Sequence, residues 1–258
     1  MFKKLLSSIG IGAATVDTRL AENSCVPGGT LDGVVHIKGG NVEQSVDRIY
    51  IFFNTLYKHE VNDKTTYSTF TIEKILLNEA PFMIGPDEVK EIPFTIEVPF
   101  NTPISVSQSK TWIETGLDIA QAVDPKDEDS ILVKPNRQQQ VILDVLDDIG
   151  FRLKKADTEM LPARQRSGRL PIAQELEYSP NGTSFGRRLD ELEVILLQDE
   201  TNLDLLIQVD KSVHSLGSLF ADLTGTDEST HRLSYSQADL SSPERIRRDI
   251  ESLIERSI

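Results

Sequence analysis

The feature that most constrains this chain is an apolar–polar alternation with a period of two, which runs through residues 15–115. In one stretch Leu31, Val35 and Ile37 share a parity between two glycine pairs. Successive side chains of a strand point to opposite faces, so the pattern predicts antiparallel strands joined by tight turns. About six or seven such strands in roughly 100 residues make one β-sandwich.

In two segments of this half, the residue types predict whether the strand is central or at an edge of its sheet. Asp47–Tyr57 is apolar on both parities, which favours a central strand. Glu91–Ser105 carries Pro93 and Pro99 on the parity opposite to its apolar residues. Because proline lacks the N–H that a ladder needs, this segment is expected at a sheet edge or at strand ends.

A charged break at Asp124–Ser130 sets the predicted domain boundary, with one domain over 1–130 and another over 131–258. The alternation of Val141, Leu143 and Val145 predicts a strand soon after it. Leu192–Leu197 and Leu203–Val209 predict a hairpin. The expected fold is therefore all-β, with two β-sandwich domains.

Helices are expected near both ends of the sequence. Within Met1–Ile9 the apolar residues fall at helical spacing, which favours a short docking helix over a signal peptide. Ser212–Leu223 also has helical spacing. Ser242 and Pro243 suit the start of a helix whose apolar stripe predicts packing on its own domain, with partner docking as the alternative.

Composition narrows the class of function. The formal net charge of −14 disfavours nucleic acid as a partner, since binding to a phosphate backbone needs a basic face. Cys25 is the single cysteine, so no internal disulfide forms, and a cytoplasmic protein is expected. No apolar stretch reaches the roughly 18 residues of a membrane span. Peripheral membrane contact of the N-terminal segment stays open.

Catalytic and metal-binding motifs are missing from the sequence. The four histidines stand apart from other ligand residues, and neither a nucleophile elbow nor a phosphate-binding glycine loop occurs. We therefore expect a protein that is not an enzyme and has no cofactor. A site dispersed over several loops is one alternative. Calcium binding by the acidic segment Asp124–Asp129 is another, against a solvated linker.

Several long motifs resemble a known family. GIGAATVDTRL at 10–20, GVVHIKGGNVEQSVDRIYI at 33–51, SKTWIETGLDIAQAVDPKDEDS at 109–130 and HSLGSLFADLTGTDEST at 214–230 are similar to the SpoOM-type sporulation-control proteins. EIPFTIEVPFNTPIS more distantly resembles a strand of arrestin-type N-terminal domains. The resemblance implies two arrestin-like sandwiches, a cytoplasmic location and a regulatory role in entry into sporulation.

These observations predict a non-catalytic regulatory or scaffold protein that binds cytosolic proteins, with a calcium- or carbohydrate-binding module as the alternative. Charged residues at the domain interface are candidates for an interdomain latch or a partner site. The predicted latch places Arg187 or Arg188 against Asp118, Asp124 or Asp127. Arg164, Arg166 and Arg169 form a further basic cluster, either a solvated loop or, with Arg187 and Arg188, an anion-binding patch.

Overall fold

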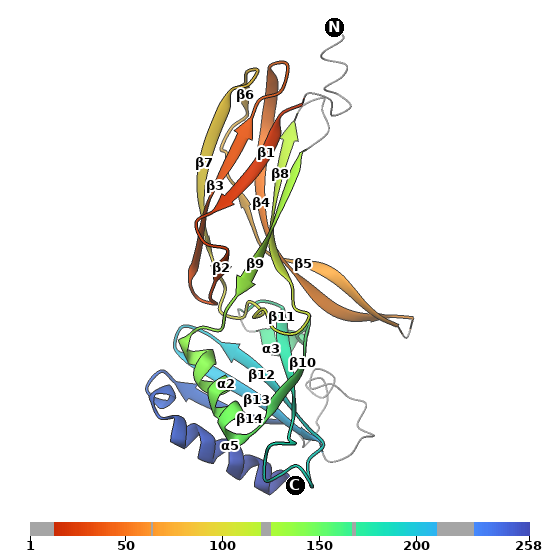
Figure 1. The fold of residues 1–258 in the computed structure, drawn as a ribbon, viewed down its shortest axis with the longest axis vertical. Coiled ribbons are helices and arrows are strands. Elements are labelled where there is room, and N and C mark those ends of the chain that lie inside the picture. Colours follow the sequence, from red (N-terminus) through yellow and green to blue (C-terminus); the bar gives the residue numbers. More distant parts are fainter. Residues whose placement is uncertain (1–12, 63, 120–124, 167–168, 211–229) are drawn as a thin grey trace.

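The computed structural model describes residues 13–62, 64–119, 125–166, 169–210 and 230–258, in two domains stacked along the long axis of the molecule (Figure 1). In chain order the elements are β1 (Thr15–Leu20), β2 (Ser24–Cys25), β3 (Thr30–Lys38), β4 (Gln44–Val61), β5 (Lys64–Leu76), β6 (Phe82–Ile84), β7 (Val89–Glu97), β8 (Thr111–Ile119), β9 (Lys126–Val133), α2 (Arg137–Ile149), β10 (Arg152–Met160), α3 (Ala163–Arg166), β11 (Ile172–Ser179), β12 (Glu191–Gln198), β13 (Asn202–Asp210), β14 (Thr230–Ser236), η1 (Asp239–Ser241) and α5 (Pro243–Ser257).

The first domain is the predicted β-sandwich. One sheet has the order β1-β3-β7 and the other β2-β9-β8-β4-β5, with β6 paired to β4. Fully buried side chains such as Val35, Ile51 and Ile113 fill the space between them. As predicted, β4 is a central strand, flanked by β5 and β8. The proline-bearing β7 lies at a sheet edge, paired in the described part of the chain with β3 alone.

The hairpin of β4 and β5 is longer than the sandwich requires. These strands have 18 and 13 residues, and their pairing continues to Val61 and Lys64 at the tip. The hairpin projects sideways from the sandwich at the level where the two domains meet (Figure 1). Its outer part therefore lies against β10 of the second domain.

The second domain is one antiparallel sheet with the strands in sequence order, β10-β11-β12-β13-β14. Helices α2 and α5 cover one of its faces, and their apolar stripes share a core with side chains such as Leu192, Leu205 and Tyr235. The all-β class with a C-terminal helix is confirmed. In the described residues, however, the layer opposite this sheet consists of helices, which differs from the expected second sandwich.

The predicted strand over Val141–Val145 is wrong, because these residues lie within α2. The side chains that it buries include Ile142, Val145, Leu146 and Ile149, at the spacing i, i+3, i+4 and i+7 of one helical face. Capping residues define both ends of the helix. Asn136 caps the start in a capping box with Gln139, and Gly150 ends it with a φ of 108°.

The predicted domain boundary falls within a strand of the first sandwich. Strand β9 pairs with β8 through residues of the expected linker, so Lys126–Val133 belongs to the first sandwich and the predicted boundary falls inside this strand. The hairpin of β12 and β13 and the helix α5 are confirmed. The predicted helices at Met1–Ile9 and Ser212–Leu223 lie outside the described residues.

Candidate functional site

The most distinctive site is an ionic contact between the β4–β5 hairpin and β10. Lys58 Nζ lies 2.9 Å from Glu159 Oε1 and 3.3 Å from Asp157 Oδ2, while Lys155 Nζ lies 2.6 Å from the same Asp157 oxygen. Tyr67 Oη donates to Asp157 Oδ1 at 2.9 Å. The side chains of Lys58 and Asp157 are only 19% and 6% exposed. We call this set (Lys58, Tyr67, Lys155, Asp157, Glu159) the hairpin latch.

The charges of the hairpin latch stabilise one another. Burial opposes the charged form of Lys58, but the hydrogen bond and the charge of Glu159, with the charge of Asp157, raise its pKa above the usual value. Burial likewise opposes ionisation of Asp157, and its bonds to Lys155 and Tyr67 outweigh that and lower its pKa. Both groups are therefore ionised at neutral pH. Breaking the contact would leave half-buried charges without their partners.

A buried carboxyl group lies beside the latch. Glu175 pairs in register with Asp157, is 8% exposed, and has one oxygen without a hydrogen-bond partner among the described residues. Burial, followed by the negative charges of Glu193 and Glu159, raises the pKa of Glu175 to about 8. This carboxyl is therefore largely protonated at pH 7, where an ordinary glutamate is ionised.

Side-chain amides join the domains at a second place. Gln174 of β11 accepts from Ile104 N at 3.0 Å and donates to Ile104 O at 2.9 Å and to Ser109 Oγ at 2.7 Å. The Asn101 side chain accepts from Gln198 N at 2.8 Å, in a buried contact. Here amides of one domain satisfy backbone groups of the other, beside apolar contacts in which Val106 and Leu143 pack against both cores.

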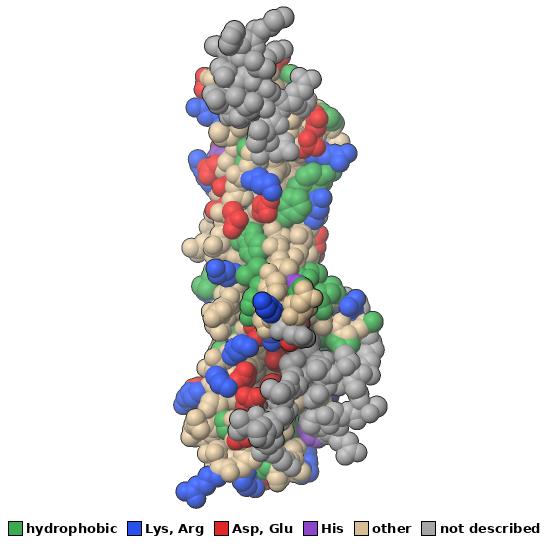
Figure 2. Space-filling view, turned by 90° about the vertical axis from the view of Figure 1, so that its right-hand side faces the viewer, with side chains coloured by type: hydrophobic (Ala, Val, Ile, Leu, Met, Phe, Trp, Pro, Cys, Tyr) green, Lys and Arg blue, Asp and Glu red, His purple; other side chains and the backbone are tan. Residues whose placement is uncertain are grey.

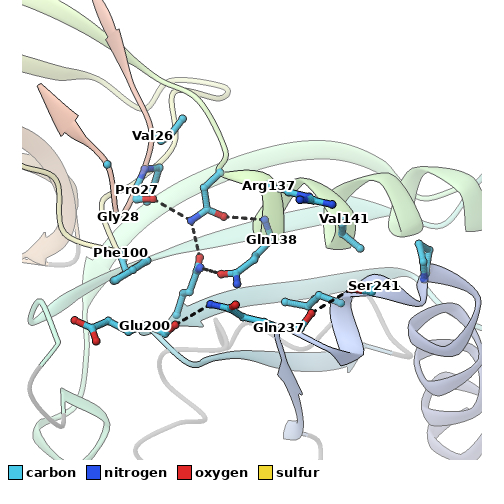
Figure 3. A pocket seen from close by; sticks show the side chains of 15 residues that line it. Val26, Pro27, Gly28, Phe100, Arg137, Gln138, Val141, Glu200, Gln237 and Ser241 are labelled. Carbon is cyan, nitrogen blue, oxygen red and sulfur yellow. Dashed lines mark hydrogen bonds between the residues drawn. The ribbon is translucent and has the colours of Figure 1, made fainter.

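A cavity of about 750 Å³ opens where α2 begins (Figure 3). Asn136 Nδ2 donates to Pro27 O in the first domain at 3.0 Å and to Gln198 Oε1 at 2.9 Å. Gln198 Nε2 in turn donates to Gln138. Phe100, Val141 and other apolar side chains share the lining with these amides. The cavity therefore has walls from both domains, and we call it the seam groove.

A further charge cluster lies within the second domain, where the buried Asp204 pairs with Arg169 and Arg232. Acidic and basic side chains are intermixed along the face shown in Figure 2. Within the described ranges no group of three or more His, Cys, Asp or Glu residues is placed to hold a metal ion. Among the helices described, none has the length and apolar character needed to cross a membrane.

The structure does not bring the described residues of the predicted arginine latch together, namely Arg187, Arg188, Asp118 and Asp127. Arg187 and Arg188 are exposed in the β11–β12 connection, which meets the C-terminal end of α2 through Gly182 and Gly150. The seam lies at the other end of this helix of 13 residues, about 20 Å away.

Two acidic residues of the predicted latch, Asp118 and Asp127, lie in the first domain. Asp118 is exposed on β8, opposite Arg48 in the register, and Asp127 on β9 accepts from Thr18 N at 2.6 Å. Asp124 lies outside the described residues. Of the basic cluster, Arg169 pairs internally with Asp199 and Asp204, and Arg166 donates to Leu161 O.

Comparison with known proteins shows which family has this two-domain arrangement. A sequence model described as SpoOM protein matches residues 2–213. The chain belongs to the SpoOM family. It is 35% identical over 254 residues to the sporulation-control protein spo0M of Bacillus subtilis, which covers 98% of this chain and 97% of the relative. It also matches the crystal structure of Bacillus subtilis Spo0M, with a TM-score of 0.88 and 33% identity over 96% of this chain and 100% of that chain.

The structural likeness to Spo0M spans both domains, so the helix-covered sheet belongs to the family fold as much as the sandwich does. Sequence reasoning missed the hairpin latch and the seam groove of this family member. Lys58 and Asp157 are separated by about 100 positions and follow ordinary strand alternation, so no local pattern distinguishes them from solvent-facing charges. The capping box at Asn136 and Gln139 was the one local sequence signal in this region, because it marks where α2 begins beside the seam groove.

Proposed function

We propose that this chain is a non-catalytic regulatory protein of the cytoplasm that controls entry into sporulation by binding other proteins. The name of the Bacillus subtilis relative supports the process, and the two-domain architecture supports the mode of action. The single observation that carries the proposal is the joint between the domains. It combines the half-buried ion pairs of Lys58 and a few amide contacts with the apolar packing of Val106 and Leu143, and such a partly polar joint can shift when a partner binds.

The chemistry of the joint favours a regulatory role over a purely structural one. A domain interface serving only stability is better built from apolar side chains, since replacing buried ion pairs by apolar groups is often neutral or stabilising. Removing one partner, in contrast, leaves a costly unpaired charge. A partner that competes for Lys58 or for the latch carboxylates therefore has a means of changing the interdomain geometry.

The test is affinity purification of tagged protein from growing and starving cells, read by mass spectrometry beside an untagged control. We expect a small, reproducible set of proteins with the native sequence. Lys58→Glu places like charges in the latch and should change which proteins are recovered or in what amount. Lys64→Glu, at the exposed tip of the same hairpin, is the matched control and should leave recovery unchanged.

Two results would contradict the proposal. One is the absence of any reproducible partner under either growth condition. The other is a purified protein that melts at a higher temperature with Ca²⁺ or a glycan, because a ligand of the native state stabilises it by mass action. That outcome would favour a ligand-binding module.

A further inference from the structure

A small internal cavity lies inside the joint between the domains, apart from the open seam groove. Its volume is about 20 Å³. Residues 101–104, which follow β7, form the wall from the first domain, and Gln139 of α2 and Gln174 of β11 contribute to the wall from the second. Thr102 and Gln139 are only 2% and 5% exposed. The cavity is therefore largely closed off from bulk solvent.

Three residues that line this cavity have polar atoms with unused hydrogen-bonding capacity. Gln139 Oε1 accepts from Asn136 N at 3.0 Å in the capping box, but Gln139 Nε2 has no acceptor in the described part of the chain. Thr102 Oγ1 is buried and has no partner among the described residues. Gln174 Oε1 accepts from Ile104 N at 3.0 Å and has a second lone pair. A donor, a hydroxyl and an acceptor therefore surround one small space.

The size and the polarity of the cavity together select its occupant. A cavity needs roughly 10–15 Å³ to hold a water molecule, so about 20 Å³ admits one water and excludes larger ligands. Apolar cavities stay dry, whereas a buried water typically makes about three hydrogen bonds to groups that otherwise lack partners. No carboxylate lies among the lining residues, and the Gln139 amide presents N–H groups, which disfavours a metal cation.

We propose that this cavity holds one ordered water molecule that bridges the two domains. The water accepts a hydrogen bond from Gln139 Nε2 and donates to Gln174 Oε1 and Thr102 Oγ1. It supplies the partners that the described protein groups do not give to Gln139 and Thr102, as buried polar groups require. The inference is independent of the proposed function, because it concerns how the joint itself is built.

The bridge also connects the joint to the start of α2. One end of the Gln139 amide completes the capping box with Asn136, and the other end holds the water. The Gln174 amide likewise bonds the first domain directly through Ile104 and, through the water, reaches Thr102. Since a bridging water is nearly as favourable as a direct hydrogen bond, it contributes to the joint on the same footing as these amide contacts.

A high-resolution crystal structure of the full chain tests the assignment directly. We expect one density peak within about 3.2 Å of Gln139 Nε2, Gln174 Oε1 and Thr102 Oγ1. A cavity without such a peak, or a Gln139 amide that bonds Thr102 or Gln174 directly, would overturn the inference.

Two threonine variants test the bridge in solution. Thr102→Val keeps the shape of the side chain and removes one partner of the water, so we expect the equilibrium constant for unfolding in urea to rise about three- to tenfold. Thr111→Val is the matched control. Thr111 Oγ1 is also buried without a partner in the described ranges, but Thr111 lines neither this cavity nor the seam groove.

Replacing a buried hydroxyl that bonds nothing by a methyl group relieves an unsatisfied polar atom, so Thr111→Val should leave the unfolding constant unchanged or lower it. A larger rise in Thr102→Val than in Thr111→Val supports the water bridge. Equal effects of the two changes would show that the Thr102 hydroxyl has no more partners than the Thr111 hydroxyl, which contradicts the bridge.

Discussion

Glu175 is the residue whose ionisation should most affect stability. Its pKa is raised from 4.5 to about 8 by burial and by neighbouring carboxylates. Below pH 4.5 it is protonated in both the folded and the unfolded state. Between pH 4.5 and 8 only the folded state keeps the proton, so the free energy of unfolding falls as pH rises through this window. Glu175→Gln should remove that loss.

Urea unfolding at pH 5 and pH 8.5 measures the effect. We expect Glu175→Gln to exceed the native protein in stability at pH 8.5, by an amount on the order of a few kcal/mol, and to differ much less at pH 5. Glu114→Gln, a change of the same type on β8 of the first domain, is the control. If the free energy of unfolding depends on pH in the same way in the native protein and in Glu175→Gln, protonation of Glu175 is not the cause of that dependence.

At the scale of secondary-structure elements, the two main helices begin in chemically different ways. Asn136 accepts from Gln138 N at 3.1 Å and from Gln139 N at 3.0 Å, and it also bonds both walls of the seam. Ser242 precedes α5 without a side-chain capping bond. Asn136→Ala should therefore cost about 2 kcal/mol, whereas Ser242→Ala should cost at most about 0.5 kcal/mol.

Chemical denaturation of the two variants under one set of conditions compares these caps. Circular dichroism at 222 nm follows the helices directly. Equal losses in the two variants would mean that the bonds of Asn136 contribute no more than an ordinary exposed N-cap. A larger loss at Ser242 would contradict the assignment of the capping box as the main determinant of where α2 starts.

For the whole molecule, the joint determines whether the two domains unfold together. Each domain has its own apolar core, with Val106 and Leu143 packed against both, and the hairpin latch and the Gln174 contacts add polar coupling between them. Calorimetry of the native chain should show one transition. The double change Lys58→Ala and Gln174→Ala should resolve it into two, because each core then melts on its own.

The matched control is the double change Lys64→Ala and Gln140→Ala, which alters the same residue types at exposed positions that make no hydrogen bond between the domains in the described part of the chain. We expect it to keep a single transition. A single transition at an unchanged temperature in the Lys58 and Gln174 variant would show that other contacts couple the domains.

Much of the architecture follows from local pattern. The alternation along β3, the stretch of β4 that is apolar on both parities and Pro93 of β7 predicted the first sandwich, because side chains of a strand alternate between its two faces. The stripe of α5 predicted its packing in the same way. The strand expected over Val141–Val145 failed because a helix that buries every third and fourth residue also shows short stretches of alternation. There the capping box and Gly150 were the better guides.

The sequence by itself therefore determined the strand-rich class, the central and edge strands of the sandwich, the helix at the C-terminus and the likeness to the SpoOM family. Only the tertiary structure decided which charges meet across the domains. Lys58 lies against Asp157 because an unusually long hairpin carries it beyond its own sandwich, and Asn136 meets Pro27 because α2 begins at the seam. Such contacts depend on the relative placement of two separately folded cores, and no local periodicity records that placement.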